Sequence, residues 1–134
     1  MVSAMSIFYI PCSNEPEASM ISRQLLEEQL IACGNIIGPV RSFFRWEGQI
    51  QESMEVILIL KTRVECSENL QQRIKELHSY SCPCILELSP HSINQPYLEW
   101  IRSVVPWEAP SPKTPIKALK PIPAPTISDR PPWD

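Results

Sequence analysis

Hydrophobic and polar positions along the first part of the chain follow first a two-residue and then a helical period. Residues 6–11 form a short apolar, β-branched run that ends at a proline, which is typical of a buried strand. A helix is predicted to begin near Asn14, because Pro16 is tolerated in a first turn and Glu17 has capping-box spacing. Its apolar positions recur at helical spacing up to Gly34, where we predict that it ends: Ala18, Ile21, Leu25, Leu26, Leu30 and Cys33.

A pair of long strands follows this helix. Residues 35–46 return to a strand pattern, and the break at Gly38 and Pro39 indicates a bulge or an edge position, because proline cannot donate to a sheet ladder. A turn signal over residues 47–49 leads into a second strand, residues 50–62, which is polar at its start and apolar on both faces at its end. We therefore predict a long hairpin that is buried at one end and protrudes at the other.

A second helix, a short strand and a last helix complete the pattern. Thr62 and Glu65 have the spacing of a capping box, and an apolar stripe then predicts a helix that ends near His78: Cys66, Leu70, Ile74 and Leu77. Residues 84–88 are predicted to be a fourth strand. A short helix is predicted to start around Pro96 and to present four residues on one face: Tyr97, Trp100, Ile101 and Val104.

The resulting order is βαββαβ plus a C-terminal helix, which is the ferredoxin-like α+β arrangement. This fold is an antiparallel sheet with helices on one face, so the other face needs a cover. Because the predicted strands are apolar on that face as well, we expect the chain to self-associate.

Proline content divides the 134-residue chain into two parts. Eight of its 15 prolines lie in residues 108–134, so we predict a folded domain over residues 1–107 and a proline-rich tail without a packed core. Residues 112–115 fit the P-x-x-P pattern, which makes the tail a candidate docking segment for a protein partner. The alternative is a passive, solvated tail.

Charge and residue counts exclude several function classes. A formal net charge of -3 argues against nucleic-acid binding. The five cysteines are odd in number and follow no disulfide spacing, and no signal peptide or membrane span is evident, so a reduced, cytoplasmic protein is expected. Because residues 1–107 contain no aspartate, and no Ser-His-Asp set, phosphate loop or Cys-x-x-Cys pair is present, we do not predict an enzyme.

Several short segments of the chain resemble the CutA family, also called divalent-cation tolerance proteins. They cover about residues 6–102 in family order: Tyr9-Ile10-Pro11-Cys12, Leu30-Ile31-Ala32-Cys33-Gly34-Asn35, Trp46-Glu47-Gly48, Lys61-Thr62-Arg63, Leu77-His78-Ser79-Tyr80 and Pro96-Tyr97-Leu98-Glu99-Trp100-Ile101. The resemblance implies a homotrimer whose sheets pack around a three-fold axis and whose long hairpins reach onto neighbours. It also implies a non-enzymatic role linked to copper tolerance and divalent-metal binding, and in animals to the localisation of acetylcholinesterase.

The resemblance also suggests metal ligands. Cys12 lies at the family's cysteine position, and His78 matches the histidine of its Leu-His-Pro-Tyr segment. Cys84 stands where the family has a glutamate that opens the fourth strand, and Cys82 adds a thiol two residues away. Soft donors favour copper or zinc, so we predict Cys12, His78 and Cys84 as ligands of copper or another divalent ion. The alternative is a decayed site, in which Cys12 packs as a small hydrophobe and His78 caps a helix.

Four residues are candidates for the cleft between family subunits, where a cation and aromatic rings would hold a small anion: Trp46, Lys61, Tyr80 and Trp100. The alternative is that these rings fill a trimer interface. Three functions therefore stay open at this point: a metal-binding trimer, an oligomeric scaffold with a vestigial metal site, and a sensor that binds a small molecule between subunits.

Overall fold

The four strands form one antiparallel sheet, which confirms the predicted ferredoxin-like α+β fold. The computed structural model describes residues 4–107, and the predicted tail lies outside the described residues. Strand order in the sheet is β2-β3-β1-β4. In chain order the elements are β1 (Met5–Cys12), α1 (Glu15–Glu27), β2 (Cys33–Trp46), β3 (Gln49–Arg63), the 3-10 helix η1 (Val64–Cys66), α2 (Ser67–Leu77), β4 (Leu86–Leu88) and α3 (Gln95–Val104).

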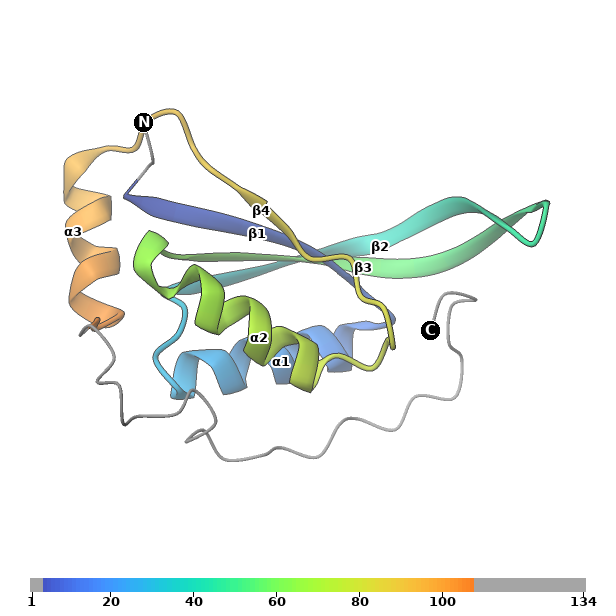
Figure 1. The fold of residues 1–134 in the computed structure, drawn as a ribbon, viewed down its shortest axis with the longest axis horizontal. Coiled ribbons are helices and arrows are strands. Elements are labelled where there is room, and N and C mark those ends of the chain that lie inside the picture. Colours follow the sequence, from blue (N-terminus) through green and yellow to red (C-terminus); the bar gives the residue numbers. More distant parts are fainter. Residues whose placement is uncertain (1–3, 108–134) are drawn as a thin grey trace.

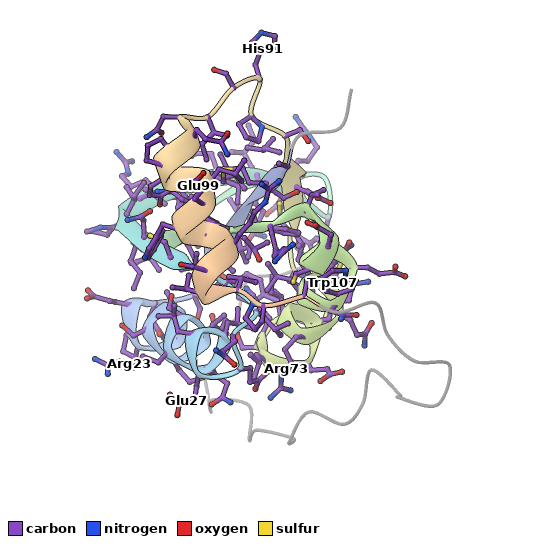
Figure 2. The ribbon with its side chains drawn as sticks, turned by 90° about the vertical axis from the view of Figure 1, so that its left-hand side faces the viewer. Arg23, Glu27, Arg73, His91, Glu99 and Trp107 are labelled. Carbon is purple, nitrogen blue, oxygen red and sulfur yellow. The ribbon has the colours of Figure 1, made fainter. Side chains whose placement is uncertain are left out.

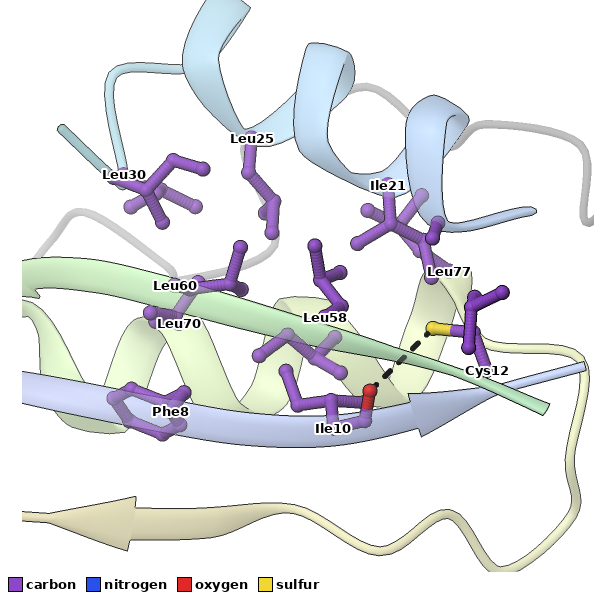
Figure 3. Packing of buried hydrophobic residues seen from close by; sticks show 14 residues of the cluster. Phe8, Ile10, Cys12, Ile21, Leu25, Leu30, Leu58, Leu60, Leu70 and Leu77 are labelled. Carbon is purple, nitrogen blue, oxygen red and sulfur yellow. Dashed lines mark hydrogen bonds between the residues drawn. The ribbon is translucent and has the colours of Figure 1, made fainter. Parts of the chain in front are cut away.

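Two helices cover one face of the sheet. Figure 1 shows α1 and α2 along that face, α3 at one end of the sheet, and the β2–β3 hairpin protruding at the other end, as the sequence predicts. The core lies between the helix pair and the central strands, where side chains of α1 meet those of β1 and β3 (Figure 3). Each fully buried Leu, Ile or Phe there contributes about 1.5–3 kcal/mol. The fully buried members include Phe8, Ile10, Ile21, Leu25, Leu58, Leu60, Leu70, Ile74 and Leu77.

The opposite face of the sheet is apolar and open over much of its area. Strand side chains alternate between the two faces, so Phe8 and Ile10 face the helices while Tyr9 faces away. The pairing register places seven large apolar residues on this second face: Ile7, Tyr9, Ile37, Ile57, Ile59, Leu86 and Leu88. Among residues 4–107, α3 packs at one end of the face near Ile7, and Figure 1 shows no other helix across it. We call this set the open sheet face.

The predicted irregularity in the first long strand is confirmed. Pairing between β2 and β3 shifts between Ile37 and Val40, and β2 is an edge strand of the sheet. Gly38 has a φ of 153°, and a Cβ there would lie 3.0 Å from a methyl group of Val56. Glycine therefore fits this bulge both in its backbone angle and in the close approach of the neighbouring strand.

The end of the first helix differs from the prediction. Instead of continuing to Gly34, α1 ends at Glu27, and Gln29 adopts the left-handed conformation with a φ of 58°. Two hydrogen bonds close the helix end, from the Leu30 N–H to the Leu25 carbonyl and from the Gln29 N–H to the Leu26 carbonyl, both at 3.0 Å. This is a Schellman motif, which usually has glycine at the left-handed position. Helical spacing alone did not reveal it, because Leu30 is buried after the helix has ended.

Replacing Gln29 with glycine is expected to stabilise the protein by about 0.5–1 kcal/mol, because glycine adopts the left-handed conformation without steric strain. The matched control is Arg23→Gly at an exposed position inside the helix, which should instead destabilise by about 1 kcal/mol. Urea unfolding of the two variants gives both differences. If both variants lose stability equally, strain at Gln29 is not significant.

Two further details correct the sequence prediction. Thr62 does not cap the second helix, because its hydroxyl donates to the Leu30 carbonyl at 2.7 Å; η1 precedes α2 instead. The fourth strand is limited to Leu86–Leu88, since its register with β1 would place Cys84 opposite Pro11, which has no N–H to pair.

The last helix, α3, also buries a different face from the one that the sequence predicts. In α3 the buried residues are Leu98 and Ile101, whereas Trp100 is 42% exposed. Figure 2 looks onto α3, with Glu99 on its outer side and Trp107 beyond its end. The apolar face predicted for this helix is therefore correct at Ile101 and wrong at Trp100 in the single chain.

Candidate functional site

Three buried residues from separate elements converge at one end of the sheet. Cys12 is the last residue of β1, Glu17 lies in the first turn of α1, and His78 directly follows α2. One ligand-type atom from each lies within 4.8 Å of the other two. We call this group the buried cluster. The other histidine, His91, lies in the exposed loop between β4 and α3 (Figure 2).

Both ring nitrogens of His78 are engaged by the protein. The Tyr80 N–H lies 3.1 Å from Nδ1, and since this group can only donate, Nδ1 accepts. Nε2 lies 2.9 Å from the Pro11 carbonyl oxygen, which can only accept, so Nε2 carries the proton and donates. These two partners select the neutral Nε2–H tautomer and leave no ring lone pair directed at a metal ion.

Glu17 holds together the chain segments around it. Its carboxylate accepts hydrogen bonds from the Ser13 N–H at 2.9 Å, the Ser13 hydroxyl at 3.0 Å and the Ser79 N–H at 2.8 Å. Burial alone would raise the pKa of Glu17, but the hydrogen bonds from Ser79 and Ser13 outweigh burial and lower it. Asn14 caps the helix as predicted, since its side-chain oxygen accepts from the Glu17 N–H at 2.9 Å.

The thiol of Cys12 is neutral and enclosed. Cys12 is fully buried, and its Sγ lies 3.7 Å from the Ile10 carbonyl oxygen, the contact drawn in Figure 3. Burial, followed by the negative charges of Glu17 and Glu55, raises the pKa of this thiol far above its usual range. Because the thiolate is the reactive form of cysteine, the raised pKa makes Cys12 a poor nucleophile.

A second buried carboxylate lies beside the cluster. Glu55 of β3 is 4% exposed and accepts a hydrogen bond from the Tyr80 hydroxyl at 2.8 Å. Burial and then this bond raise the pKa of Tyr80. Glu55 and Tyr80 border a pocket of about 400 Å³, whose other lining residues are Pro11, Cys82, Pro83 and Cys84. We call it the thiol pocket.

The predicted ligand set is therefore divided between two places. Cys12 and His78 meet in the buried cluster, whereas Cys84 borders the thiol pocket and is not one of the three clustered residues. Cys12, Glu17 and His78 lie close enough to share a metal ion, but the buried cluster as folded does not fit one, because His78 uses both ring nitrogens internally and Glu17 accepts three hydrogen bonds. Its arrangement instead joins β1, α1 and the segment after α2.

The four residues predicted for a cleft lie in three places within one chain. Lys61 lies on β3 with its Nζ 5.7 Å from the centroid of the Tyr97 ring, and that ring is 5.4 Å from Trp100. Tyr80 borders the thiol pocket, and Trp46 ends β2 at the tip of the hairpin. Of the four predicted residues, the structure thus places Lys61 and Trp100 near each other, because both lie against the Tyr97 ring.

Sequence reasoning missed Glu17 and Glu55 as members of these sites. Glu17 was recognised only through its capping-box spacing, although its side chain also reaches the Ser79 N–H, 62 residues away in the sequence. Glu55 had one usable signal, a carboxylate at the start of an otherwise apolar strand segment. A buried carboxylate needs donors or a positive charge close by, so such a residue indicates a polar partner in the fold.

The architecture and this site define a class of protein: a small ferredoxin-like α+β chain with a protruding hairpin, an open apolar sheet face and a hydrogen-bonded buried cluster. A family model described as CutA1 divalent ion tolerance protein matches residues 6–104. The chain therefore belongs to the CutA family of divalent ion tolerance proteins.

Individual relatives agree with this assignment. The divalent-cation tolerance protein CutA of Pyrococcus horikoshii is 42% identical over 97 residues, which cover 72% of this chain and 94% of that protein. The crystal structure of the divalent ion tolerance protein CutA1 from Ehrlichia chaffeensis matches with a TM-score of 0.76 at 30% identity, over 80% of this chain and 99% of that one. The periplasmic divalent cation tolerance protein CutA from Archaeoglobus fulgidus matches with a TM-score of 0.72 at 38% identity, over 75% and 98%. Along residues 4–107, no helix has the length and apolarity to span a membrane.

Proposed function

We propose that this chain is a homotrimeric, non-enzymatic protein that binds a thiophilic metal ion, copper first among them, in the response to divalent ions. The observation that carries the proposal is the open sheet face. Leu86 and Leu88 on it are 49% and 50% exposed, and Ile37 is 51% exposed. Contiguous apolar surface of this kind marks an association site, and a cyclic trimer would bury three such faces against one another.

The edges of the sheet support the same assembly. β2 and β4 are the outer strands of the four-stranded sheet, so each presents unpaired backbone groups along one side. The protruding hairpin carries exposed apolar side chains as well, with Phe43 61% and Ile50 73% exposed. Neighbouring copies would cover these positions, and the predicted contact between hairpins and adjacent subunits provides such a cover.

The state of the nucleophilic candidates supports a non-enzymatic role. Cys12 is a buried thiol whose pKa is raised, and both ring nitrogens of His78 are hydrogen-bonded within the protein. Neither can act as a nucleophile or a general base without the cluster being broken. Of the predicted metal ligands, Cys84 is the one with an exposed thiol, so the metal-binding part of the proposal depends on the thiol pocket.

Native mass spectrometry of the full chain under reducing conditions, with and without Cu(I), tests the proposal. The expected species is three copies of the 15.3 kDa chain, with added mass from bound copper only in the second sample. A stable monomer would contradict the assembly, and a trimer that retains no copper would contradict the metal-binding role.

A further inference from the structure

Glu55 is a buried carboxylate that has no positively charged partner among residues 4–107. It is 4% exposed and lies on the same face of β3 as Ile57, at the hairpin end of the open sheet face. The Tyr80 hydroxyl donates to its Oε2 at 2.8 Å, and no ion pair within the described residues includes Glu55. A buried carboxylate is costly unless it is paired, so this position favours a cation.

The thiol pocket provides space for such a cation beside Glu55. Its volume is about 400 Å³, within the range of about 300–1,000 Å³ that is typical of small-molecule sites. Those sites combine mainly apolar walls with a few placed polar groups. Here Pro11 and Pro83 supply apolar lining, and Glu55 with Tyr80 supplies the polar end. The pocket therefore has the size and lining for a small organic molecule with one positively charged end.

The hydrogen bonding of Glu55 favours one kind of cation. A guanidinium group pairs best with a carboxylate through two parallel hydrogen bonds, which engage both oxygens. Oε2 already accepts from Tyr80, and within residues 4–107 Oε1 of Glu55 accepts no hydrogen bond. An ammonium group is a compact charge that needs only one of the two oxygens, so it matches Oε1.

We propose that Glu55 binds the ammonium group of a small organic amine in the thiol pocket, with the apolar part of the amine against Pro11 and Pro83. The inference goes beyond the proposed function, which gives Glu55 no ligand, and it does not depend on metal binding. The ammonium group donates hydrogen bonds to the carboxylate, and no covalent bond forms. Because Glu55 lies on the face that we propose for assembly, a cation of a neighbouring subunit is the competing occupant.

Benzylammonium is the probe, because it joins one ammonium group to a flat apolar ring. Isothermal titration calorimetry of the full chain in buffer with EDTA and a reducing agent should give a Kd of about 0.1–1 mM. Benzyl alcohol has nearly the same shape without the charge, so it should bind at least about 10-fold more weakly.

Glu55→Gln keeps the shape of the side chain and removes its charge, so benzylammonium should bind at least about 10-fold more weakly to this variant. The matched control is Glu52→Gln, because Glu52 is an exposed carboxylate on the same strand and pairs with Arg41. This control should bind benzylammonium like the wild type.

The exposed thiol of Cys84 gives a second measurement on the wild-type chain, since it borders the same pocket. Bound benzylammonium should slow the alkylation of Cys84 by iodoacetamide, whereas benzyl alcohol at the same concentration should not. Cys33 on β2 is the internal reference, and its alkylation should stay unchanged. If Glu55→Gln does not fold, as judged by circular dichroism, this measurement and the comparison with benzyl alcohol decide the question.

Two results would overturn the inference. The first is equal affinity of wild type and Glu55→Gln for benzylammonium, or of the wild type for benzylammonium and benzyl alcohol. The second is a wild-type chain that binds no benzylammonium; a weaker Glu55→Gln trimer in sedimentation velocity would then assign the pocket to a cation of the neighbouring subunit. Native mass spectrometry measures trimer and copper independently, so failure of this inference is distinguishable from failure of the proposed function.

Discussion

Ile59→Lys is expected to convert the proposed trimer into monomers. Ile59 lies in the middle of the open sheet face, opposite Tyr9 of β1 and Asn35 of β2. A lysine there would place a charge in a desolvated apolar interface, and trimer symmetry would repeat that cost three times. Sedimentation velocity at micromolar concentration should show the monomer for the variant and the trimer for the wild type.

The control for this experiment is Leu26→Lys. Leu26 is 45% exposed on α1, the helix that covers the other face of the sheet, so its replacement removes an exposed leucine without touching the open sheet face. This variant should remain trimeric. If Ile59→Lys fails to fold, Leu88→Lys on the edge strand β4 replaces it, since Leu88 is 50% exposed in the single chain. A trimer in both open-face variants would contradict the proposed assembly.

Glu17→Ala is expected to destabilise the protein by about 2–4 kcal/mol, because it leaves buried donors without an acceptor. The substitution removes the acceptor of the Ser13 N–H, the Ser13 hydroxyl and the Ser79 N–H, and so disconnects the start of α1 from the segment after α2. Chemical denaturation at neutral pH measures the loss. Glu15→Ala is the control, since Glu15 is an exposed acidic residue in the same first turn.

The pH dependence of this contribution follows from the lowered pKa of Glu17. A carboxylate with a lower pKa in the folded state stabilises the fold above its unfolded pKa of about 4.3, and the contribution is lost as the pH falls toward the folded value. The stability difference between wild type and Glu17→Ala should therefore shrink between neutral pH and about pH 3. A difference that stays constant across this range would contradict a structural role for the ionised carboxylate.

Local signals predicted most of the fold, and they failed where a tertiary contact replaced a local one. The order of elements, the bulge at Gly38 and the cap at Asn14 depend on neighbouring residues, and all three are confirmed. Thr62 has the local features of a cap, but its hydroxyl bonds the Leu30 carbonyl. The first helix ends early because Gln29 accepts a left-handed conformation that places Leu30 in the core.

The buried cluster and the thiol pocket show the same difference between what local sequence predicts and what tertiary contacts decide. The sequence identified Cys12 and His78 as a pair of interest and named Cys82 and Cys84 as neighbouring thiols, because residue type and spacing are visible in it. Whether a given thiol is a ligand depends on its charge state and accessibility, which burial and neighbouring carboxylates control. Those quantities depend on residues distant in the chain, such as Glu17 and Glu55, and no local pattern contains them.

The amino-acid sequence by itself determined the order of strands and helices, the family, and the apolar pattern on both faces of the sheet. Each of these follows from hydrophobic periodicity and short motifs. Only the tertiary structure decided that Cys12 and His78 are satisfied inside the protein while Cys82 and Cys84 border a pocket. The physical reason is that hydrogen-bond satisfaction and desolvation are set by groups brought together in folding, and these decide which polar side chains remain free to bind.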